Sequence, residues 1–307
     1  MNEDIDKLLG DCVHCGFCLP TCPTYVLWGE EMDSPRGRIN LMQQHQEGAP
    51  LTPEMVGHFD ACLGCMACVT ACPSGVQYDK LIEATREEVE QTHPRSRQDR
   101  ALREAIFALF PYPKRLRALR GPLRAYQRTG LARLVQPALE RLNPALAAME
   151  RLAPPLSRAY RLPPVVRSRT TRRATVGMLT GCVQREFFPQ VNSATARVLA
   201  MEGCDVVIPR SQGCCGALSL HSGRGAQARA FARSTIAAFE AVDMIVVNSA
   251  GCGSAMKEYA ALFADDPAWA GRAEALSART RDLSEFLVEL GPQAERHPLP
   301  ATVAYHD

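Results

Sequence analysis

The sequence predicts an α+β chain of several domains. We expect a helical, cysteine-rich domain over residues 1–94, a basic helical connector over 95–174, and an α/β domain with a mostly parallel sheet over 175–307. Three observations support this organisation. Eight of the thirteen cysteines form two similar blocks near the N-terminus, basic residues gather in the middle, and β-branched runs alternate with alanine-rich stretches after residue 174.

Composition excludes several classes of protein. A chain of 307 residues that is 46% hydrophobic and 22% charged is long enough for a packed core, and it is neither disordered nor collagen-like. Residues 1–7 lack a secretory signal, and the uncharged stretch 61–78 holds four cysteines, two glycines and a proline, which excludes a membrane span. We therefore expect a cytoplasmic protein whose odd number of thiols serves metal or redox chemistry.

The two cysteine blocks carry the most specific motif. Each block reads C-x2-C-x2-C-x3-C-P, the pattern of bacterial ferredoxins, in which three closely spaced thiolates bind one [4Fe–4S] cluster and the fourth binds the other. Crossed ligation then gives two sets, Cys12, Cys15, Cys18 and Cys72 for the first cluster and Cys62, Cys65, Cys68 and Cys22 for the second. Such clusters carry single electrons and leave no open corner for a substrate.

A zinc module is the alternative for these blocks, because paired C-x2-C is also a zinc signature. A tetrahedral zinc site would not need a third cysteine and a spaced Cys-Pro in each block. The 39 residues between Cys22 and Cys62 exceed what a hairpin ferredoxin needs, and a helical pattern follows Ser34-Pro35. We therefore expect a helical ferredoxin-like domain.

The middle of the chain is strongly basic. Residues 95–173 contain 19 Arg and Lys against 4 Asp and Glu, and the rest of the chain is acidic. Apolar residues recur at helical spacing, for example over 101–110, which predicts several short amphipathic helices. Their arginines are either solvated in a connector or form a face for anionic lipid or an acidic partner. No nucleic-acid reader motif accompanies the charge, so no nucleic-acid partner is expected.

The last part of the sequence has a βαβ rhythm. Strands are expected over 174–179, 205–208 and 243–247, with helices near 188–203 and 218–241, and this alternation predicts a mostly parallel sheet covered by helices. Four glycine-flanked cysteines follow these strands, where the carboxyl ends of parallel strands form a crevice. The pattern predicts a third metal site, with an iron–sulfur cluster as its candidate occupant, at Cys182, Cys214, Cys215 and Cys252.

The alternative is that these four thiols are ordinary buried side chains. Cys204 differs from them because it begins a strand at the opposite end of the sheet, and we expect it in the core. His221 follows Cys215 by six residues and is either a group at this site or, more commonly for a histidine on a helix face, structural.

The cysteine blocks, the segment Asp-Ser-Pro-Arg-Gly-Arg-Ile at 33–39 and the Gly-Cys, Gly-Cys-Cys-Gly and Gly-Cys-Gly series together resemble the iron–sulfur subunit of bacterial glycolate oxidase. More broadly, they resemble the CCG-domain proteins, which include heterodisulfide reductase subunits, the anaerobic glycerol-3-phosphate dehydrogenase iron–sulfur subunit and lactate-utilisation proteins. The resemblance covers essentially the whole chain, and its first 80 residues are the part most specific to the glycolate oxidase branch.

This resemblance implies an electron-transfer subunit of an oxidoreductase complex. A separate FAD-containing subunit would oxidise glycolate to glyoxylate, and this chain would pass the electrons toward a membrane quinone from the inner face of the cytoplasmic membrane. The chain itself would have no catalytic residue and no activity alone, which agrees with the absence of a G-x-G-x-x-G fingerprint from its sequence.

Two departures from the family pattern keep alternatives open. The heterodisulfide reductase version ends in C-x2-C, whereas Ala255 stands three residues after Cys252, which argues against a catalytic thiol or disulfide site. The family usually has two CCG copies, and residues 303–307 resemble the start of a second copy, so we expect this chain to lack the remainder. The iron–sulfur subunit of another CCG-family complex and a heterodisulfide-type thiol catalyst are the alternative functions.

Some residues near the first block also have two interpretations. Arg36 and Arg38 either tune a nearby cluster or meet a flavin subunit, or they form ordinary surface pairs. Phe17, Tyr25 and Trp28 are expected in the core, where they would shield the clusters from water.

Overall fold

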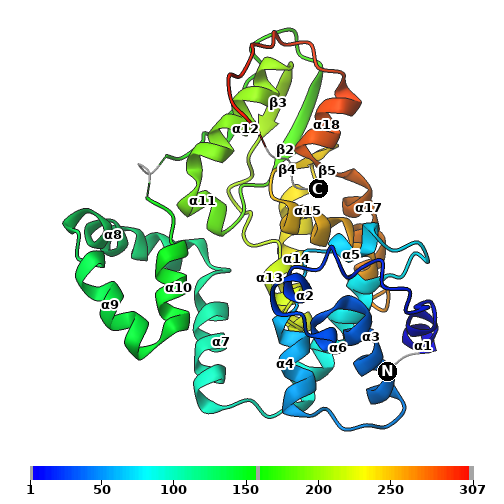
Figure 1. The fold of residues 1–307 in the computed structure, drawn as a ribbon. Coiled ribbons are helices and arrows are strands. Elements are labelled where there is room, and N and C mark those ends of the chain that lie inside the picture. The colour runs from blue at the N-terminus through cyan, green and yellow to red at the C-terminus, as the bar shows by residue number, and fades with distance from the viewer. Residues whose placement is uncertain (1–2, 157–159, 304–307) are drawn as a thin grey trace. The chain divides into compact units, whose positions relative to one another are not determined.

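The computed structural model describes residues 3–156 and 160–303. Its internal contacts divide the chain into two units. Unit 1 comprises the described parts of Met1–Ser96, Leu218–Gly225 and Pro298–Asp307, and unit 2 comprises those of Arg97–Ala217 and Ala226–His297 (Figure 1). Each unit is described by itself.

Unit 1 is helical, as the sequence predicts. It contains α1 (Glu3–Gly10), α2 (Pro23–Trp28), the 3-10 helix η1 (Glu31–Asp33), α3 (Pro35–Gln46), α4 (Pro53–Ala61), α5 (Ala67–Thr70) and α6 (Tyr78–Thr92). Two helices begin in the same way, with a hydroxyl that accepts from a backbone amide and a proline next to it. The Ser34 hydroxyl accepts from the Gly37 amide at 2.9 Å in α3, and Thr52 caps α4. Phe59 and Ile82 lie fully buried in the core between these helices.

Gly37 explains the spacing within the 33–39 segment. A Cβ atom at this position would lie 2.0 Å from the Glu31 carbonyl oxygen, so only glycine lets α3 lie against η1. Next to this close approach, Arg38 lies in the interior of the unit, where its side chain is 1% exposed.

The segment Leu218–Gly225 belongs to unit 1 through contacts with α6. The Arg86 guanidinium donates to the His221 carbonyl at 2.9 Å, and the His221 ring lies 2.6 Å from the Glu83 carboxylate. Arg224 pairs with Glu90 at 2.9 Å. The helix α13 (Ala217–Leu220) therefore lies where the chain changes unit.

The basic middle forms four helices of unit 2, which confirms the amphipathic helices expected there. They are α7 (Arg97–Leu109), α8 (Pro113–Thr129), α9 (Ala132–Leu142) and α10 (Pro144–Leu152). Helix α9 contacts both α8 and α10 (Figure 1). Arg117 of α8 forms a bidentate pair with the buried Glu186, at 2.6 and 3.3 Å, and Tyr112 contacts the Phe231 ring edge to face. These contacts join the basic helices to the α/β part of the unit.

A five-stranded sheet lies in unit 2, in the order β1-β3-β2-β4-β5. Its strands are β1 (Val165–Val166), β2 (Ala174–Met178), β3 (Cys204–Val207), β4 (Ile245–Val247) and β5 (Thr280–Asp282). All neighbouring pairs are parallel except the edge pair of β1 and β3, which confirms a mostly parallel sheet. The sequence analysis missed the short strands β1 and β5, because two or three residues carry no periodicity.

Helices cover both faces of this sheet. The further helices are α11 (Val183–Phe187), α12 (Pro189–Met201), α14 (Gly225–Phe239), α15 (Ala250–Lys257), α16 (Tyr259–Leu262), α17 (Ala270–Arg279) and α18 (Leu283–Leu290). Leu199 of α12 and Phe286 of α18 share one core with Val176 and Val206. On the other face, Phe239 at the end of α14 lies so close to Gly177 that a Cβ there would meet its ring at 2.9 Å. The result is a three-layer α/β/α arrangement.

The buried carboxylate of Glu202 fixes the segment after α18. It accepts from the amides of Gln293 and Ala294 at 2.7 and 3.1 Å, and Arg296 donates to its other oxygen at 2.5 Å. These bonds outweigh burial and lower the pKa of Glu202. Over the part of the chain that the structure describes, no helix has both the length and the apolar character that a membrane span requires.

Candidate functional site

The eight cysteines of unit 1 surround two neighbouring cavities. Thiols that line the first are Cys12, Cys15, Cys18 and Cys72, and thiols that line the second are Cys22, Cys62 and Cys65; Cys68 lies between them and touches both. No described carboxylate lines either cavity. The first cavity combines three thiols of the first block with Cys68 and Cys72 of the second, and the second cavity combines three thiols of the second block with Cys22 of the first. Soft thiolates without competing oxygen ligands are the donors that iron–sulfur clusters prefer.

The two blocks repeat a backbone conformation as well as a sequence pattern. In each block the residues on both sides of the second cysteine have positive φ, namely His14 (53°) and Gly16 (85°) in the first and Gly64 (65°) and Met66 (59°) in the second. Left-handed turns of this kind allow backbone amides to face a bound anion, as they do around many iron–sulfur clusters. Because glycine takes one of the two positions in each block and the other carries a side chain, the residues alone did not reveal this repeat.

Arg38 lies beside Cys22, in the wall of the second cavity. Its guanidinium donates to the His58 carbonyl at 2.6 Å, to the Thr24 hydroxyl at 3.2 Å and to the Asp33 carboxylate at 3.2 Å, and it lies 4.0 Å from the Cys22 sulfur. The surface-pair interpretation is therefore wrong for Arg38. Arg36 pairs with Glu31 at 2.6 Å with both side chains partly exposed, but it also donates to the His14 carbonyl at 3.1 Å and lines the first cavity, so it is not a surface pair alone.

Two further residues that the sequence analysis did not select touch Cys62. The Tyr78 hydroxyl donates to the Cys62 sulfur at 3.7 Å, and Arg86 donates to the Cys62 carbonyl at 2.5 Å. Burial and the neighbouring Cys62 raise the pKa of Tyr78, so its hydroxyl stays a donor. Burial also raises the pKa of Cys68 to about 12, so metal binding at this thiol has to displace a proton.

Aromatic side chains near the first block do not lie in the core, contrary to expectation. Phe17 is 65% exposed and Trp28 is 59% exposed, and only Tyr25 is partly covered. Val13 and Leu63, which line the first and second cavities, are also exposed. The expectation was wrong because helices α3, α4 and α6 supply the core of unit 1. The cysteine loops therefore present apolar side chains to solvent.

The four glycine-flanked cysteines of unit 2 come together at the carboxyl ends of the strands. Cys182 follows β2 and its thiol lies 3.6 Å from that of Cys214, which follows β3. Cys215 interacts with the thiols of Cys214 and Cys252, the latter in α15 after β4. Among the described residues, no three His, Cys, Asp or Glu side chains meet at the spacing of a single metal ion.

Hydrogen bonds differentiate these four thiols. Cys214 accepts from the thiols of Cys182 and Cys215 and from the Gly216 amide, at 3.3 Å for the last, and these bonds lower its pKa. The pKa of Cys182 is raised because it donates to Cys214, and burial adds to this effect. Cys214 is therefore the thiol at which negative charge is best stabilised.

Two buried side chains hold the loops that carry the thiols. Gln212 bonds to the Met178 carbonyl at 3.1 Å and to the Thr180 amide at 2.7 Å, which ties the loop after β3 to the end of β2. The Tyr259 hydroxyl donates to the Cys215 carbonyl. Neither residue is recognisable from the sequence, because each acts through the fold rather than through a motif.

Comparison with known proteins supplies the family. A family model for a 4Fe-4S dicluster domain matches residues 9–76, one for the linker region of the glycolate oxidase iron–sulfur subunit matches 98–153, and one for a cysteine-rich domain, CCG, matches 176–257. The glycolate oxidase iron–sulfur subunit of Escherichia coli K12 is 38% identical over 292 residues, which are 93% of this chain and 67% of that protein. The chain belongs to the glycolate oxidase iron–sulfur subunit family.

Other relatives agree with this membership. The probable glycolate oxidase iron–sulfur subunit of Bacillus subtilis 168 is 40% identical over 290 residues, which are 91% of this chain and 65% of that protein. Lactate utilization protein A of Shouchella clausii is 38% identical over 115 residues, or 38% of this chain and 48% of that protein. The chain thus spans about two thirds of the length of the two glycolate oxidase relatives. No solved structure matched it.

Cys204, His221 and Ala255, which the sequence analysis also considered, lie in environments that indicate structural roles. Cys204 begins β3 and is fully buried in the core, as expected. His221 lies against Glu83 of unit 1, which favours the structural interpretation. Ala255 is fully buried in α15, so the position that carries a fourth cysteine in C-x2-C provides no sulfur here.

Proposed function

We propose that this chain is the iron–sulfur electron-transfer subunit of a flavin-linked complex that oxidises glycolate or a related 2-hydroxy acid. Electrons would come from an FAD-containing partner subunit and leave toward a membrane quinone. The proposal rests on the two thiol-lined cavities of unit 1 and on the membership of the family. The chain is not expected to be active without its partner.

Under this proposal, each thiol-lined cavity holds one [4Fe–4S] cluster, which supplies reversible one-electron transfer. One cluster is held by Cys12, Cys15, Cys18 and Cys72 and the other by Cys62, Cys65, Cys68 and Cys22. A third iron–sulfur cluster is proposed at Cys182, Cys214, Cys215 and Cys252. The corresponding domains would be 1–94, 95–174 and 175–307, the last being the first of two CCG copies.

The chain's own residues then have defined tasks. The left-handed backbone beside the second cysteine of each block would let amides face the cluster. Arg38 and Tyr78 place donors beside Cys22 and Cys62, where they favour added negative charge. The exposed Phe17, Val13 and Leu63 give both cavities an apolar rim, which suits docking of an electron-transfer partner.

The basic helices support a peripheral position on the cytoplasmic face of the membrane. Exposed leucines of α9 and α10, such as Leu134, Leu142 and Leu152, accompany arginines in this segment. Exposed apolar and cationic side chains on short helices suit an anionic lipid surface. Co-sedimentation with phosphatidylglycerol vesicles tests this part. Binding should weaken as salt rises, and equal binding to neutral phosphatidylcholine vesicles would contradict it.

Iron analysis tests the cluster assignment. Anaerobically purified protein should contain about twelve irons per chain if the third cluster is present, and Cys214→Ser should reduce the content to about eight. Cys204→Ala, a core cysteine in the same sheet, is the matched control and should leave the content unchanged. About eight irons in both the wild type and Cys214→Ser would reject the third cluster, and zinc without iron would reject the whole proposal.

EPR spectra of reduced variants test the crossed arrangement. Cys72→Ser and Cys15→Ser should alter the same cluster signal, because both thiols line the first cavity. Cys22→Ser and Cys65→Ser should alter the other signal. If Cys72→Ser instead matches Cys65→Ser, ligation is not crossed and the two sets must be exchanged.

A thiol or disulfide catalyst of the heterodisulfide type is the second candidate. It is favoured by one observation, which is that Cys214 lines a large cavity. The test is whether the protein reduces a disulfide substrate in the absence of glycolate. This candidate expects the activity to be lost in Cys214→Ser and retained in Cys12→Ser. The electron-transfer proposal expects flavin-linked electron uptake that depends on Cys12.

A further inference from the structure

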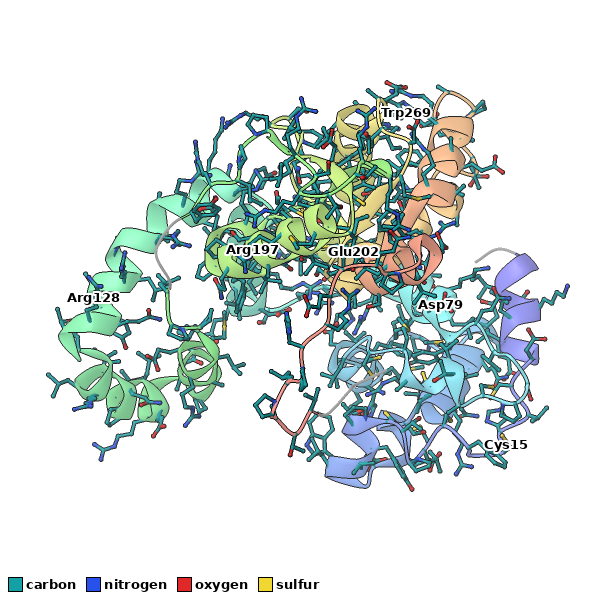
Figure 2. All side chains as sticks on the ribbon, turned by 90° about the horizontal axis from the view of Figure 1, so that it is seen from above. Cys15, Asp79, Arg128, Arg197, Glu202 and Trp269 are labelled. Atoms are coloured by element: carbon teal, nitrogen blue, oxygen red, sulfur yellow. The ribbon has the colours of Figure 1, made fainter. Side chains whose placement is uncertain are left out.

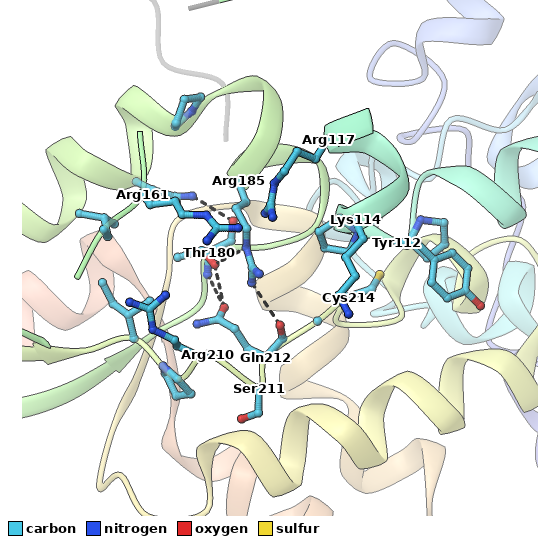
Figure 3. Close-up of a pocket in the computed structure, with 18 of the residues that line it drawn as sticks. Tyr112, Lys114, Arg117, Arg161, Thr180, Arg185, Arg210, Ser211, Gln212 and Cys214 are labelled. Carbon is cyan, nitrogen blue, oxygen red and sulfur yellow. Dashed lines mark hydrogen bonds between the residues drawn. The ribbon is translucent and has the colours of Figure 1, made fainter. Parts of the chain in front are cut away.

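A cavity of about 820 Å³ in unit 2 encloses space that the electron-transfer proposal does not use. It lies where α8 meets the loops after β2 and β3, and Cys214 forms part of its wall (Figure 3). Cavities that bind small molecules commonly enclose roughly 300–1,000 Å³. The space is therefore large enough for a small-molecule ligand.

The wall of this cavity is strongly cationic. The basic side chains that line it come from four parts of the chain, and they are Lys114, Arg115, Arg117, Arg161, Arg185 and Arg210. No Asp or Glu occurs among its described lining residues. Converging like charges on low-dielectric walls repel each other and concentrate a positive potential in the space between them.

Only part of this charge is neutralised within the protein. Arg117 pairs with Glu186, which lies outside the lining, and Arg115 stacks on the Tyr112 ring at 4.1 Å. Lys114 and Arg210 are exposed, and neither has a carboxylate partner among the described residues. The cavity therefore presents free cations that an incoming anion can use.

Arg185 is held in the wall of the cavity by two hydrogen bonds. Its guanidinium donates to the Thr180 hydroxyl at 3.0 Å and to the Gln212 carbonyl at 3.2 Å (Figure 3). Burial lowers the pKa of Arg185; the Glu186 carboxylate opposes this effect, and the cations of Arg117 and Arg161 add to it. Because Arg117, Arg161 and Arg185 line the same cavity, a bound anion would relieve the repulsion between them.

We infer that this cavity binds a small soluble anion that carries at least two carboxylate or phosphoryl groups. A single carboxylate can engage only two or three of six cations, whereas a multiply charged ligand can engage cations from several parts of the wall. Charge-assisted hydrogen bonds to guanidinium groups suit both carboxylate and phosphoryl oxygens. The inference does not depend on the electron-transfer role, because it concerns cations rather than thiols.

Calorimetric titration of the intact, anaerobically purified protein with pyrophosphate is the primary test. Saturable binding is expected, with acetate binding much more weakly. The double variant K114Q/R210Q should weaken pyrophosphate binding about tenfold or more, which corresponds to the loss of one charge-assisted hydrogen bond. The matched control R128Q/R197Q removes two exposed arginines of α8 and α12 outside the cavity and should change affinity less than about twofold (Figure 2).

Lysine acetylation followed by mass spectrometry gives a second readout on the unaltered chain. Pyrophosphate should slow the modification of Lys114 but not that of Lys80, an exposed lysine of α6. The inference is wrong if pyrophosphate does not saturate, if both double variants weaken binding equally, or if Lys114 and Lys80 are protected alike. It is also wrong if K114Q/R210Q impairs binding to phosphatidylglycerol vesicles without affecting pyrophosphate, since the anion would then be a lipid headgroup.

Discussion

Replacing Arg38 with methionine should destabilise unit 1 far more than the same change at Arg36. Arg38 is 1% exposed and its guanidinium bonds to His58, Thr24 and Asp33, so Arg38→Met leaves a carboxylate and two further acceptors without this donor. Removing one partner of a buried ion pair costs about 3–5 kcal/mol. The His58 ring stays 2.9 Å from the Asp33 carboxylate and softens the loss, so we expect about 3 kcal/mol, the lower end of that range.

Arg36→Met is the matched control because it makes the same substitution two residues earlier in α3. Its pair with Glu31 is partly exposed, and such pairs contribute about 0–1 kcal/mol. Guanidinium unfolding of the intact protein, followed anaerobically by far-UV circular dichroism, should show the midpoint for unit 1 about 1 M lower in Arg38→Met and little changed in Arg36→Met. Equal midpoints for the two variants would refute the reasoning, because burial would then not determine the cost.

Three further outcomes follow from the contacts of single side chains. Tyr78→Phe removes the donor 3.7 Å from the Cys62 sulfur and should lower the potential of one cluster, and only one, by roughly 20–60 mV in an EPR-monitored redox titration. Glu202→Ala should release residues 293–296, because it removes the three bonds that hold them. Amide hydrogen exchange should become faster in this segment and change little in the sheet. Unchanged exchange would show that the three bonds do not hold the segment. Burial opposes protonation of His45, but its bonds to Glu88 and to a backbone carbonyl raise its pKa above 6.5. The protonated His45 therefore stabilises the folded state fully below pH 6.5, and this contribution is lost as pH rises through the raised pKa. Unfolding midpoints measured between pH 6 and 9 should therefore fall by an amount equivalent to less than about 1 kcal/mol, and His45→Gln should abolish that dependence.

The parts of this protein that the sequence predicts best are those controlled by local rules. The Ser34-Pro35 pair marks the start of α3, and the β-branched runs mark β2, β3 and β4. The gathering of Cys182, Cys214 and Cys252 was predictable because parallel strands place their carboxyl ends at one edge. In each case the residues themselves carry the information.

The parts that the sequence predicts poorly depend on which other element lies nearby. An arginine two residues from another in α3 gives no sign that one is buried and the other exposed; the contact between Gly37 and η1 decides it. Phe17 and Trp28 are of residue types that usually lie in the core, yet the helices fill the core without them. The cationic cavity was equally hidden, because Lys114 and Arg210 are nearly a hundred positions apart in the sequence.

The two cysteine blocks illustrate how one geometry can be reached with different residues. Both blocks need left-handed backbone on each side of their second cysteine, and a side chain there costs of order 1 kcal/mol or more. Each block relieves one of the two positions with glycine, Gly16 in the first and Gly64 in the second, and carries the strain at His14 or Met66. Since the strain at His14 and at Met66 persists only where the surroundings enforce it, the requirement that the two blocks share is the left-handed backbone on each side of the second cysteine. That requirement, rather than the identity of the intervening residues, is what the repeated spacing of cysteines preserves.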